Sequence, residues 1–240
     1  MATEVVTHGH ADQLVADEWG GGALPYRVGH KKLGMWLFIV SDALTFSALL
    51  IAYSYTRVTS DQWATPFAFS PSILFSTTMT LCLLASSFTM VMAVKASAHR
   101  NKRAARRWIG ATMIGGLLFL GLHIYEWVHL IEEGLRPFSL PGEWVARWPQ
   151  ASPLFGATFF AITGLHMFHV VTGVAYLFVV SARIRRMTHE DVEISGLYWH
   201  FVDLVWMFVF PMIYLLSVDF TPGAHAASET AGLVLRLLPW

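Results

Sequence analysis

Charged side chains and cysteine are both scarce in this 240-residue sequence, and each shortage narrows the class of protein. Charged residues make up only 13% of the chain, whereas hydrophobic residues make up 55%. Soluble domains carry about a quarter charged residues, so this balance is typical of an integral membrane protein. Sixteen basic side chains offset sixteen acidic ones. A net charge of zero gives no reason to expect nucleic acid as a partner.

The single cysteine, Cys82, excludes a disulfide framework or a thiolate metal cluster built within this chain. The first thirty residues have neither an apolar core nor a small-residue cleavage site, so we expect residues 1–30 to form a polar cytoplasmic tail instead of a cleaved signal peptide. His8 and His10 in this tail have no nearby cysteine. We expect both histidines to be solvated, because two histidines alone make a poor metal site.

Five apolar stretches are each long enough to cross a hydrocarbon layer of roughly 30 Å at about 1.5 Å per residue. They cover residues 33–55, 72–96, 108–130, 154–182 and 196–218. Lipid offers backbone groups no hydrogen-bonding partner, so each stretch should be a helix, and the period-two pattern of a barrel is missing. The sequence predicts an all-α integral membrane bundle of five transmembrane helices over residues 31–218, with a C-terminal tail at 219–240.

Basic residues are unevenly divided between the two sides of this bundle. Twelve of the sixteen precede the first stretch, lie at the end of the second or between the second and third, or follow the fourth. The other side has Arg57, Arg136, Arg147 and Arg236. Because cytoplasmic loops carry the excess of basic residues, we predict a cytoplasmic N-terminus and an outside C-terminus.

Segments at the ends of the spans have simpler interpretations. Glycines and prolines in the loop at 131–153 predict a cap without long helices. Trp127 lies near a span end, where an indole buries its ring and keeps its N–H in water. Gly115, inside the third stretch, predicts close packing of two helices.

Ionisable residues inside the spans are the candidate functional residues. A charge near the bilayer centre costs about 2.5–3.5 kcal/mol on insertion scales, so such residues face protein and have partners. Several are three residues apart, which predicts one polar stripe on each helix. Asp42 lies roughly 14 Å deep, so we expect it to be protonated or hydrogen-bonded to another helix. The set is Asp42, His123, Glu126, His129, His166, His169, His200 and Asp203.

Metal binding is an alternative interpretation of these residues. Glu126 and His129 have the Glu-x-x-His spacing of di-iron bundles, and His166 with His169 could hold iron or copper. The di-iron design needs a second such motif, and the sequence has one. A haem held by two histidines on different helices, for which His123 or His166 could serve, is a further alternative. Hydrogen bonds between helices, or contacts with lipid head groups, explain the same residues without a metal. We therefore predict no catalytic, cofactor-binding or metal-binding residue in this chain.

Four motifs occur in order, on the first, third, fourth and fifth spans. They are Lys-Leu-Gly-Met-Trp-Leu-Phe-Ile-Val-Ser-Asp at 32–42, Ile-Tyr-Glu-Trp at 124–127, Thr-Gly-Leu-His-Met-Phe-His-Val at 163–170, and Leu-Tyr-Trp-His-Phe-Val-Asp-Leu-Val-Trp at 197–206. Over residues 31–218 the chain resembles subunit III of the haem-copper respiratory oxidases in its five-span bacterial form.

The resemblance implies a multi-pass accessory subunit in the bacterial inner membrane, part of a proton-pumping oxidase that reduces oxygen to water. Haem and copper are then expected in the partner, subunit I, with subunits II and IV also in the complex. The candidate polar residues would brace a bundle that holds phospholipids in a V-shaped cleft and sustains proton uptake. Asp42 stands where many members have glutamate, which leaves cytochrome c or quinol as the electron donor. A related subunit of nitric-oxide-reducing systems and a stand-alone membrane metalloprotein are the alternatives.

Overall fold

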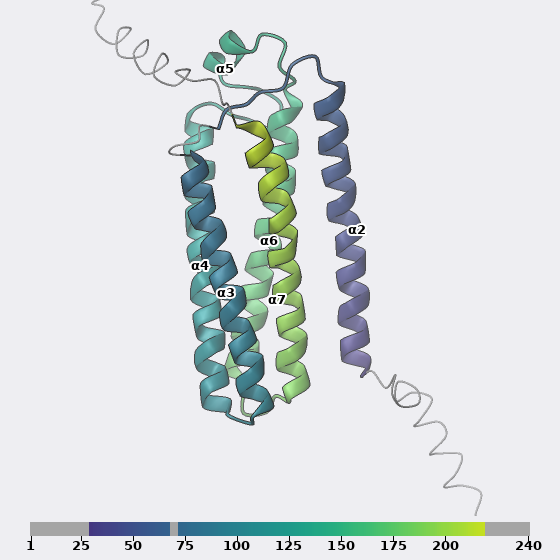
Figure 1. The fold of residues 1–240 in the computed structure, drawn as a ribbon, viewed down its shortest axis with the longest axis vertical. Coiled ribbons are helices and arrows are strands. Elements are labelled where there is room, and N and C mark those ends of the chain that lie inside the picture. Colours follow the sequence, from purple (N-terminus) through teal and green to yellow (C-terminus); the bar gives the residue numbers. More distant parts are fainter. Residues whose placement is uncertain (1–28, 68–71, 219–240) are drawn as a thin grey trace, which may run out of the picture.

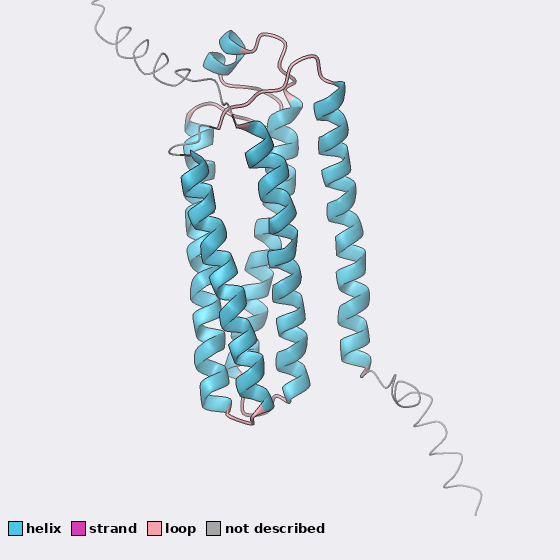
Figure 2. Cartoon of the chain, viewed as in Figure 1, coloured by secondary structure: helices cyan, strands magenta, loops and turns pink. Residues whose placement is uncertain are grey.

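The computed structural model describes residues 29–67 and 72–218, so the C-terminal tail and nearly all of the N-terminal tail, with His8 and His10, lie outside the described residues. Within these ranges the chain is helical and has no strand (Figure 2). Five helices are long and apolar enough to cross a membrane. This confirms the predicted all-α class with five spans. The long helices are α2 (His30–Thr59), α3 (Leu74–Ala98), α4 (Lys102–Glu132), α6 (Leu154–Ala182) and α7 (His189–Val209).

Helix ends differ from the predicted span ends, except at α6, where the two agree. α4 begins six residues earlier than predicted, at Lys102, and α7 begins seven residues earlier, at His189. Both starts are capped, since Asn101 accepts the Ala104 N–H at 3.1 Å and Thr188 heads a capping box. Hydropathy reports where lipid begins, whereas these caps extend the helices into polar surroundings.

α7 continues past Val209 in two irregular turns. A π-helical turn, η2 (Phe210–Tyr214), is followed by a 3-10 turn, η3 (Leu215–Ser217). Pro211 lies in the first of these turns and has no N–H to donate to the α-helical ladder. The span therefore reaches Ser217, and Tyr214 within it is fully buried.

Four of the helices form a bundle, and α2 stands at its edge (Figure 1). α3 packs against α4 and α7, and α6 packs against the same two helices, so α4 and α7 are diagonal to one another. α2 packs beside α6 and α7. Only 6% of the apolar window of α2 is buried, compared with 50% for α7. Most of the α2 surface is therefore left for lipid or another chain.

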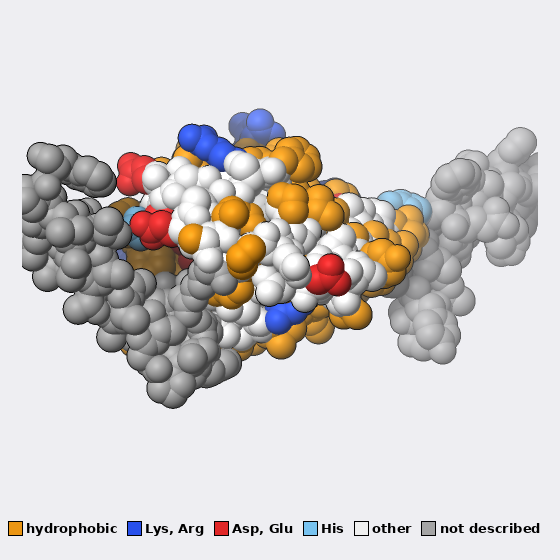
Figure 3. Space-filling view, turned by 90° about the horizontal axis from the view of Figure 1, so that it is seen from above, with side chains coloured by type: hydrophobic (Ala, Val, Ile, Leu, Met, Phe, Trp, Pro, Cys, Tyr) orange, Lys and Arg blue, Asp and Glu red, His pale blue; other side chains and the backbone are white. Residues whose placement is uncertain are grey.

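The two ends of the bundle differ in charge and in loop length. We call the end where α3 joins α4 and α6 joins α7 the basic end, because nine lysines and arginines lie within residues 95–107 and 183–189. The other, the loop end, has the long connections, in which α5 (Gly142–Arg147) is the one helix described between α4 and α6. This fits the predicted cap without long helices. Figure 3 looks onto the loop end and shows few charged side chains, with both signs interspersed.

Glycines allow the helices to approach closely at the level of Trp199. A Cβ at Gly116 on α4 would come within 2.5 Å of the Trp199 indole, and one at Gly173 on α6 within 3.1 Å. The indole of α7 therefore lies against two helices where neither has a side chain. A Cβ at Gly115 would lie 2.6 Å from Ser86 of α3, which confirms close helix packing at that residue.

Candidate functional site

α2 is attached to the bundle by polar contacts at three levels, the first at the basic end. Lys31 Nζ lies 2.8 Å from Asp191 Oδ1, and Lys32 Nζ lies 2.7 Å from Glu193 Oε1. Both acids are on α7. These ion pairs fix the start of α2 next to the start of α7.

The second level is at the loop end of α2. Arg57 donates to Ser217 Oγ at 3.2 Å and to the Leu216 carbonyl. The Tyr53 hydroxyl lies 3.2 Å from the same Ser217 oxygen. The η3 turn at the end of α7 is thus held against α2 by a cation and a buried hydroxyl.

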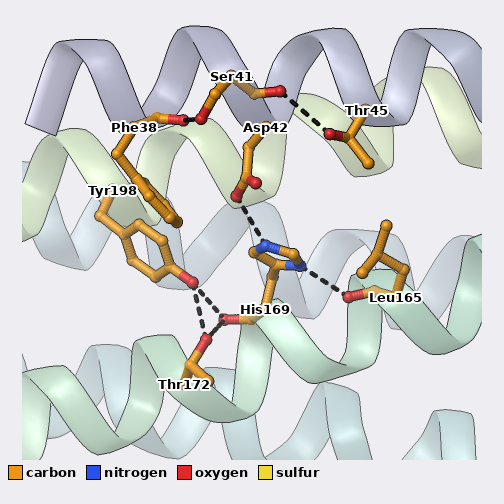
Figure 4. A network of polar contacts seen from close by, with 8 residues as sticks. All are labelled: Phe38, Ser41, Asp42, Thr45, Leu165, His169, Thr172 and Tyr198. Atoms are coloured by element: carbon orange, nitrogen blue, oxygen red, sulfur yellow. Dashed lines mark hydrogen bonds and ion pairs between the residues drawn. The ribbon is translucent and has the colours of Figure 1, made fainter.

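The third level is inside the membrane span, where Asp42 of α2 meets His169 of α6 (Figure 4). Asp42 Oδ2 lies 2.7 Å from His169 Nε2, a close contact that is off the ideal hydrogen-bond direction. His169 Nδ1 lies 2.8 Å from the Leu165 carbonyl, which only accepts, so Nδ1 carries a proton. One further proton must then lie between Nε2 and Asp42, because two lone pairs at this distance would repel.

The Asp42–His169 pair is neutral overall wherever this shared proton resides. Both a carboxylate beside an imidazolium and a carboxylic acid beside an imidazole have zero net charge. Neutrality lowers the cost of placing the pair in a hydrocarbon region, where a lone charge is unfavourable. Tyr198 supports the ring from α7 by donating to the His169 carbonyl at 3.1 Å, with Thr172 Oγ1 2.8 Å away.

A groove opens beside this pair between α2, α6 and α7. Its volume is about 590 Å³. Met35, Phe38 and Phe168 are among the side chains that line it, and Asp42 and His169 are its acidic and basic residues. The groove is thus apolar along its walls and carries a shared proton at one point.

Glu126 lies in a second polar cluster nearer the loop end. The Tyr214 hydroxyl donates to Glu126 Oε2 at 2.6 Å, and the Ser76 hydroxyl donates to Oε1 at 3.1 Å. Glu126 is buried, and its partners come from α3 and from η2. The carboxyl group therefore joins three helical segments.

His129 does not join Glu126, contrary to the predicted polar stripe on α4. Its side chain is 64% exposed and lies 3.3 Å from Glu133. Residues three apart differ by about 60° around a helix, which is enough to turn Glu126 inward and His129 outward. Burial raises the pKa of Glu133, which lies beyond the end of α4; Glu143 adds to this shift and His129 opposes it.

His123 and His166 lie in the centre of the bundle and are fully buried. Their rings lie 5.3 and 4.9 Å from the Trp206 ring, and both contact Phe119. Within the described residues none of their ring nitrogens has a hydrogen-bond partner. The structure therefore places these two histidines in an aromatic core, away from lipid and away from the polar pairs.

His200 of α7 meets a serine of α3. Ser87 Oγ lies 2.8 Å from His200 Nδ1, whereas Asp203 Oδ1 is buried without a hydrogen-bond partner among the described residues. Ser87 and Asp203 are buried at 8% exposure each, whereas His200 is partly exposed. The predicted interhelical contact is present here, although the partner residue was not anticipated.

Hydroxyl groups are the functional partners that sequence reasoning missed. Trp199 donates to Ser86 at 3.1 Å and Trp206 donates to Thr80 at 3.0 Å. Trp127 Nε1 donates to Thr163 at 3.2 Å, so the interpretation of Trp127 as an interfacial anchor with a wet N–H is wrong. The available signal was the repeated serine and threonine of α3, which is common in transmembrane helices and therefore indicates little alone.

Convergent metal ligands do not appear in the described part of the chain, where no three His, Cys, Asp or Glu side chains gather. Glu126 is hydrogen-bonded on both oxygens and His129 points away from it. The Glu-x-x-His spacing of the sequence thus does not become a shared site.

Fold and site together define a multi-pass membrane protein with buried polar contacts between its helices. The family model described as "Cytochrome c oxidase subunit III" matches residues 23–218. "Cytochrome c oxidase subunit 3" of Alkalihalophilus pseudofirmus is 31% identical over 195 residues, covering 79% of this chain and 88% of its own. "Probable quinol oxidase subunit 3" of Staphylococcus aureus strain USA300 is 28% identical over 199 residues, covering 80% and 91%. The chain belongs to the subunit III family of haem-copper oxidases.

Two further statements follow from membership of this family. Its members are subunits of respiratory oxidase complexes, so a catalytic subunit is an implied partner of this chain. The cofactors of these oxidases lie in other subunits.

Proposed function

We propose that this chain is the accessory, non-catalytic subunit III of a proton-pumping haem-copper oxidase in a bacterial inner membrane. It stands beside subunit I, which holds the haems and copper, in a complex that includes subunits II and IV. The similarity to both cytochrome c and quinol oxidase subunits supports this role and leaves the electron donor as either of the two. Residues 31–218 are the membrane domain, flanked by the tails at 1–30 and 219–240.

The Asp42–His169 pair carries the proposal about what the subunit does. It holds one exchangeable proton at membrane depth and stays neutral, and it borders a groove of about 590 Å³. A neutral pair passes a proton on and regains another without leaving an isolated charge in the hydrocarbon region. We therefore assign to it a part in sustaining proton uptake by the catalytic subunit.

The same groove is the proposed phospholipid site. Its walls are mainly apolar and aromatic, with Met35, Phe38 and Phe168 among them, which suits an acyl chain. An ordered lipid there would cover α2, whose apolar surface is almost entirely unburied in the single chain. Lipid and protein contacts together would then brace the bundle against subunit I.

Purification tests the assignment. The chain taken from its native membrane is expected to copurify with a haem- and copper-containing subunit that reduces oxygen, and the chain expressed alone is expected to be colourless. Visible spectra and metal analysis of both preparations measure this. Stoichiometric haem, iron or copper on the chain alone would instead identify a metalloprotein, and copurification with a nitric-oxide-reducing enzyme would identify the related system.

A further inference from the structure

Two polar side chains, Ser87 of α3 and His200 of α7, meet at the junction of these helices and leave one ring nitrogen of His200 open. The Ser87 hydroxyl lies 2.8 Å from His200 Nδ1, and Asp203 lies three residues further along α7. In the tautomer in which Ser87 Oγ accepts from His200 Nδ1–H, Nε2 is left with a free lone pair. No described residue approaches Nε2 within hydrogen-bonding distance, and His200 is partly exposed.

His200 lies at the wall of a groove between the two helices, which stand side by side in Figure 1. The groove has a volume of about 300 Å³ and runs from Lys95 and Glu193 at the basic end past Gly196. Because Gly196 has no side chain, Val94 and Met90 of α3 lie close to the backbone of α7 at this position. A small residue with apolar neighbours and one polar group is the pattern on which transmembrane helices associate.

The depth of His200 Nε2 in the membrane determines which kind of molecule can supply its hydrogen-bond partner. Ser87 is eleven residues from the basic end of α3 and thirteen from its other end, roughly 16 and 20 Å along the helix. A lipid head group lies near one surface and cannot supply a hydrogen bond there, and acyl chains have no polar atoms. Exposed hydroxyls elsewhere, such as those of Ser41 and Thr45, bond to carbonyls of their own helix. His200 Nε2 has no such local partner among the described residues.

We infer that the α3/α7 groove is a docking surface for a transmembrane helix of the partner subunit, and that this helix presents a hydroxyl, amide or indole donor to His200 Nε2. The inference rests on the proposed function, because it requires a partner in the membrane. It adds which face of the bundle that partner covers. The much larger exposed surface of α2 is apolar and is compatible with lipid, so it does not demand protein.

Site-specific photo-crosslinking in the native complex tests whether the α3/α7 groove is the face that contacts the partner subunit. Leu204 on α7 and Leu117 on α4 are matched, since they are 57% and 55% exposed and each lies fifteen residues from the basic end of its helix. A benzophenone amino acid at Leu204 is expected to form an adduct with the partner subunit, and one at Leu117 with lipid. Partner adducts at Leu117 alone, lipid adducts alone at Leu204, or a dimer of this chain at Leu204 would overturn the inference.

Two substitutions separate docking from a role within the chain. His200→Asn keeps a polar atom near the Nδ1 position, facing Ser87, but removes Nε2, whereas His200→Gln keeps a polar atom near the Nε2 position. Docking predicts that the Asn variant is retained about 3- to 20-fold less tightly during detergent titration of the complex, the range expected for one interhelical hydrogen bond. The Gln variant should be retained like the wild type.

The opposite order, with the Asn variant retained and the Gln variant lost, would assign His200 to internal packing and reject docking. Helix content and thermal unfolding of each variant as the isolated chain show that it is folded. Failure of the wild-type chain to copurify with any oxidase would count against the proposed function itself, whereas a normal complex with the wrong crosslinks counts against this surface alone.

Discussion

At the scale of single residues, the ionisable side chains within the spans differ in whether they have a polar partner, although all of them lie within membrane-spanning helices. Asp42 shares a proton with His169, and Glu126 accepts two hydroxyl hydrogen bonds. His123 and His166 lie instead among aromatic rings. Residue type alone therefore did not decide which of these side chains has a polar partner and which lies among aromatic rings.

Asp42→Asn is expected to assemble normally in the oxidase complex but to lose activity faster during turnover. The amide keeps the shape of the carboxyl group but cannot exchange a proton, so the loss should be largest at high pH, where protons are scarce. Oxygen consumption followed over many turnovers at several pH values measures it. Ser41→Ala is the control, since that hydroxyl bonds to the Phe38 carbonyl of its own helix. An unchanged lifetime at every pH would leave Asp42 as a packing residue.

Tyr214→Phe is expected to destabilise the bundle by about 1–2 kcal/mol, because it removes a hydrogen bond to the buried Glu126 and leaves one oxygen without a partner. Thermal unfolding of the chain in detergent measures the change. Tyr125→Phe is the matched control, since that side chain is 66% exposed. Equal unfolding temperatures for the two variants would contradict a stabilising role of the Tyr214 hydroxyl.

At the scale of helices, packing within the bundle and attachment of α2 have different physical origins. The four bundle helices approach closely where glycines face Trp199 and Ser86. α2 is attached by ion pairs and hydrogen bonds at its two ends and its middle. Substitutions of these glycines should therefore lower the stability of the bundle, and substitutions of the charged residues should weaken the attachment of α2.

Gly116→Val is expected to lower the stability of the bundle by about 1–3 kcal/mol, the usual cost of overpacking a filled core. A Cβ at this position would meet the Trp199 indole at 2.5 Å. Gly121→Val on the same helix is the control, because a Cβ there meets no atom within 4 Å. Thermal unfolding should separate the two, and a Gly121 variant as unstable as the Gly116 variant would point to lost helix geometry instead of the Trp199 contact.

At the scale of the whole molecule, the asymmetry of basic residues predicts the orientation in the membrane. The turns of the basic end should face the cytoplasm and the loop end should face outside. In a Cys82→Ala background, a cysteine at Ser139 is expected to react with a membrane-impermeant maleimide on intact cells. A cysteine at Ser97 should react only after the membrane is opened. The reverse labelling would reject the orientation.

The sequence by itself determined the number of membrane-spanning helices, their order and the family. Runs of apolar residues long enough to span lipid have one stable backbone form, so the five helices follow from hydropathy. The motifs at 32–42 and 197–206 contain residues that also proved to be in contact with other helices. The exact helix ends did not follow, because caps such as Asn101 and Thr188 act outside the apolar runs.

Only the tertiary structure decided which polar groups meet. Spacing along one helix places residues on that helix, but it does not give the rotation of the helix against its neighbours, and about 60° separates residues three apart. That rotation turned Glu126 inward and His129 outward, paired Asp42 with His169, and placed Ser87 against His200. It is set by the summed packing of side chains such as Trp199 against glycines on two other helices, which no single segment of the sequence contains.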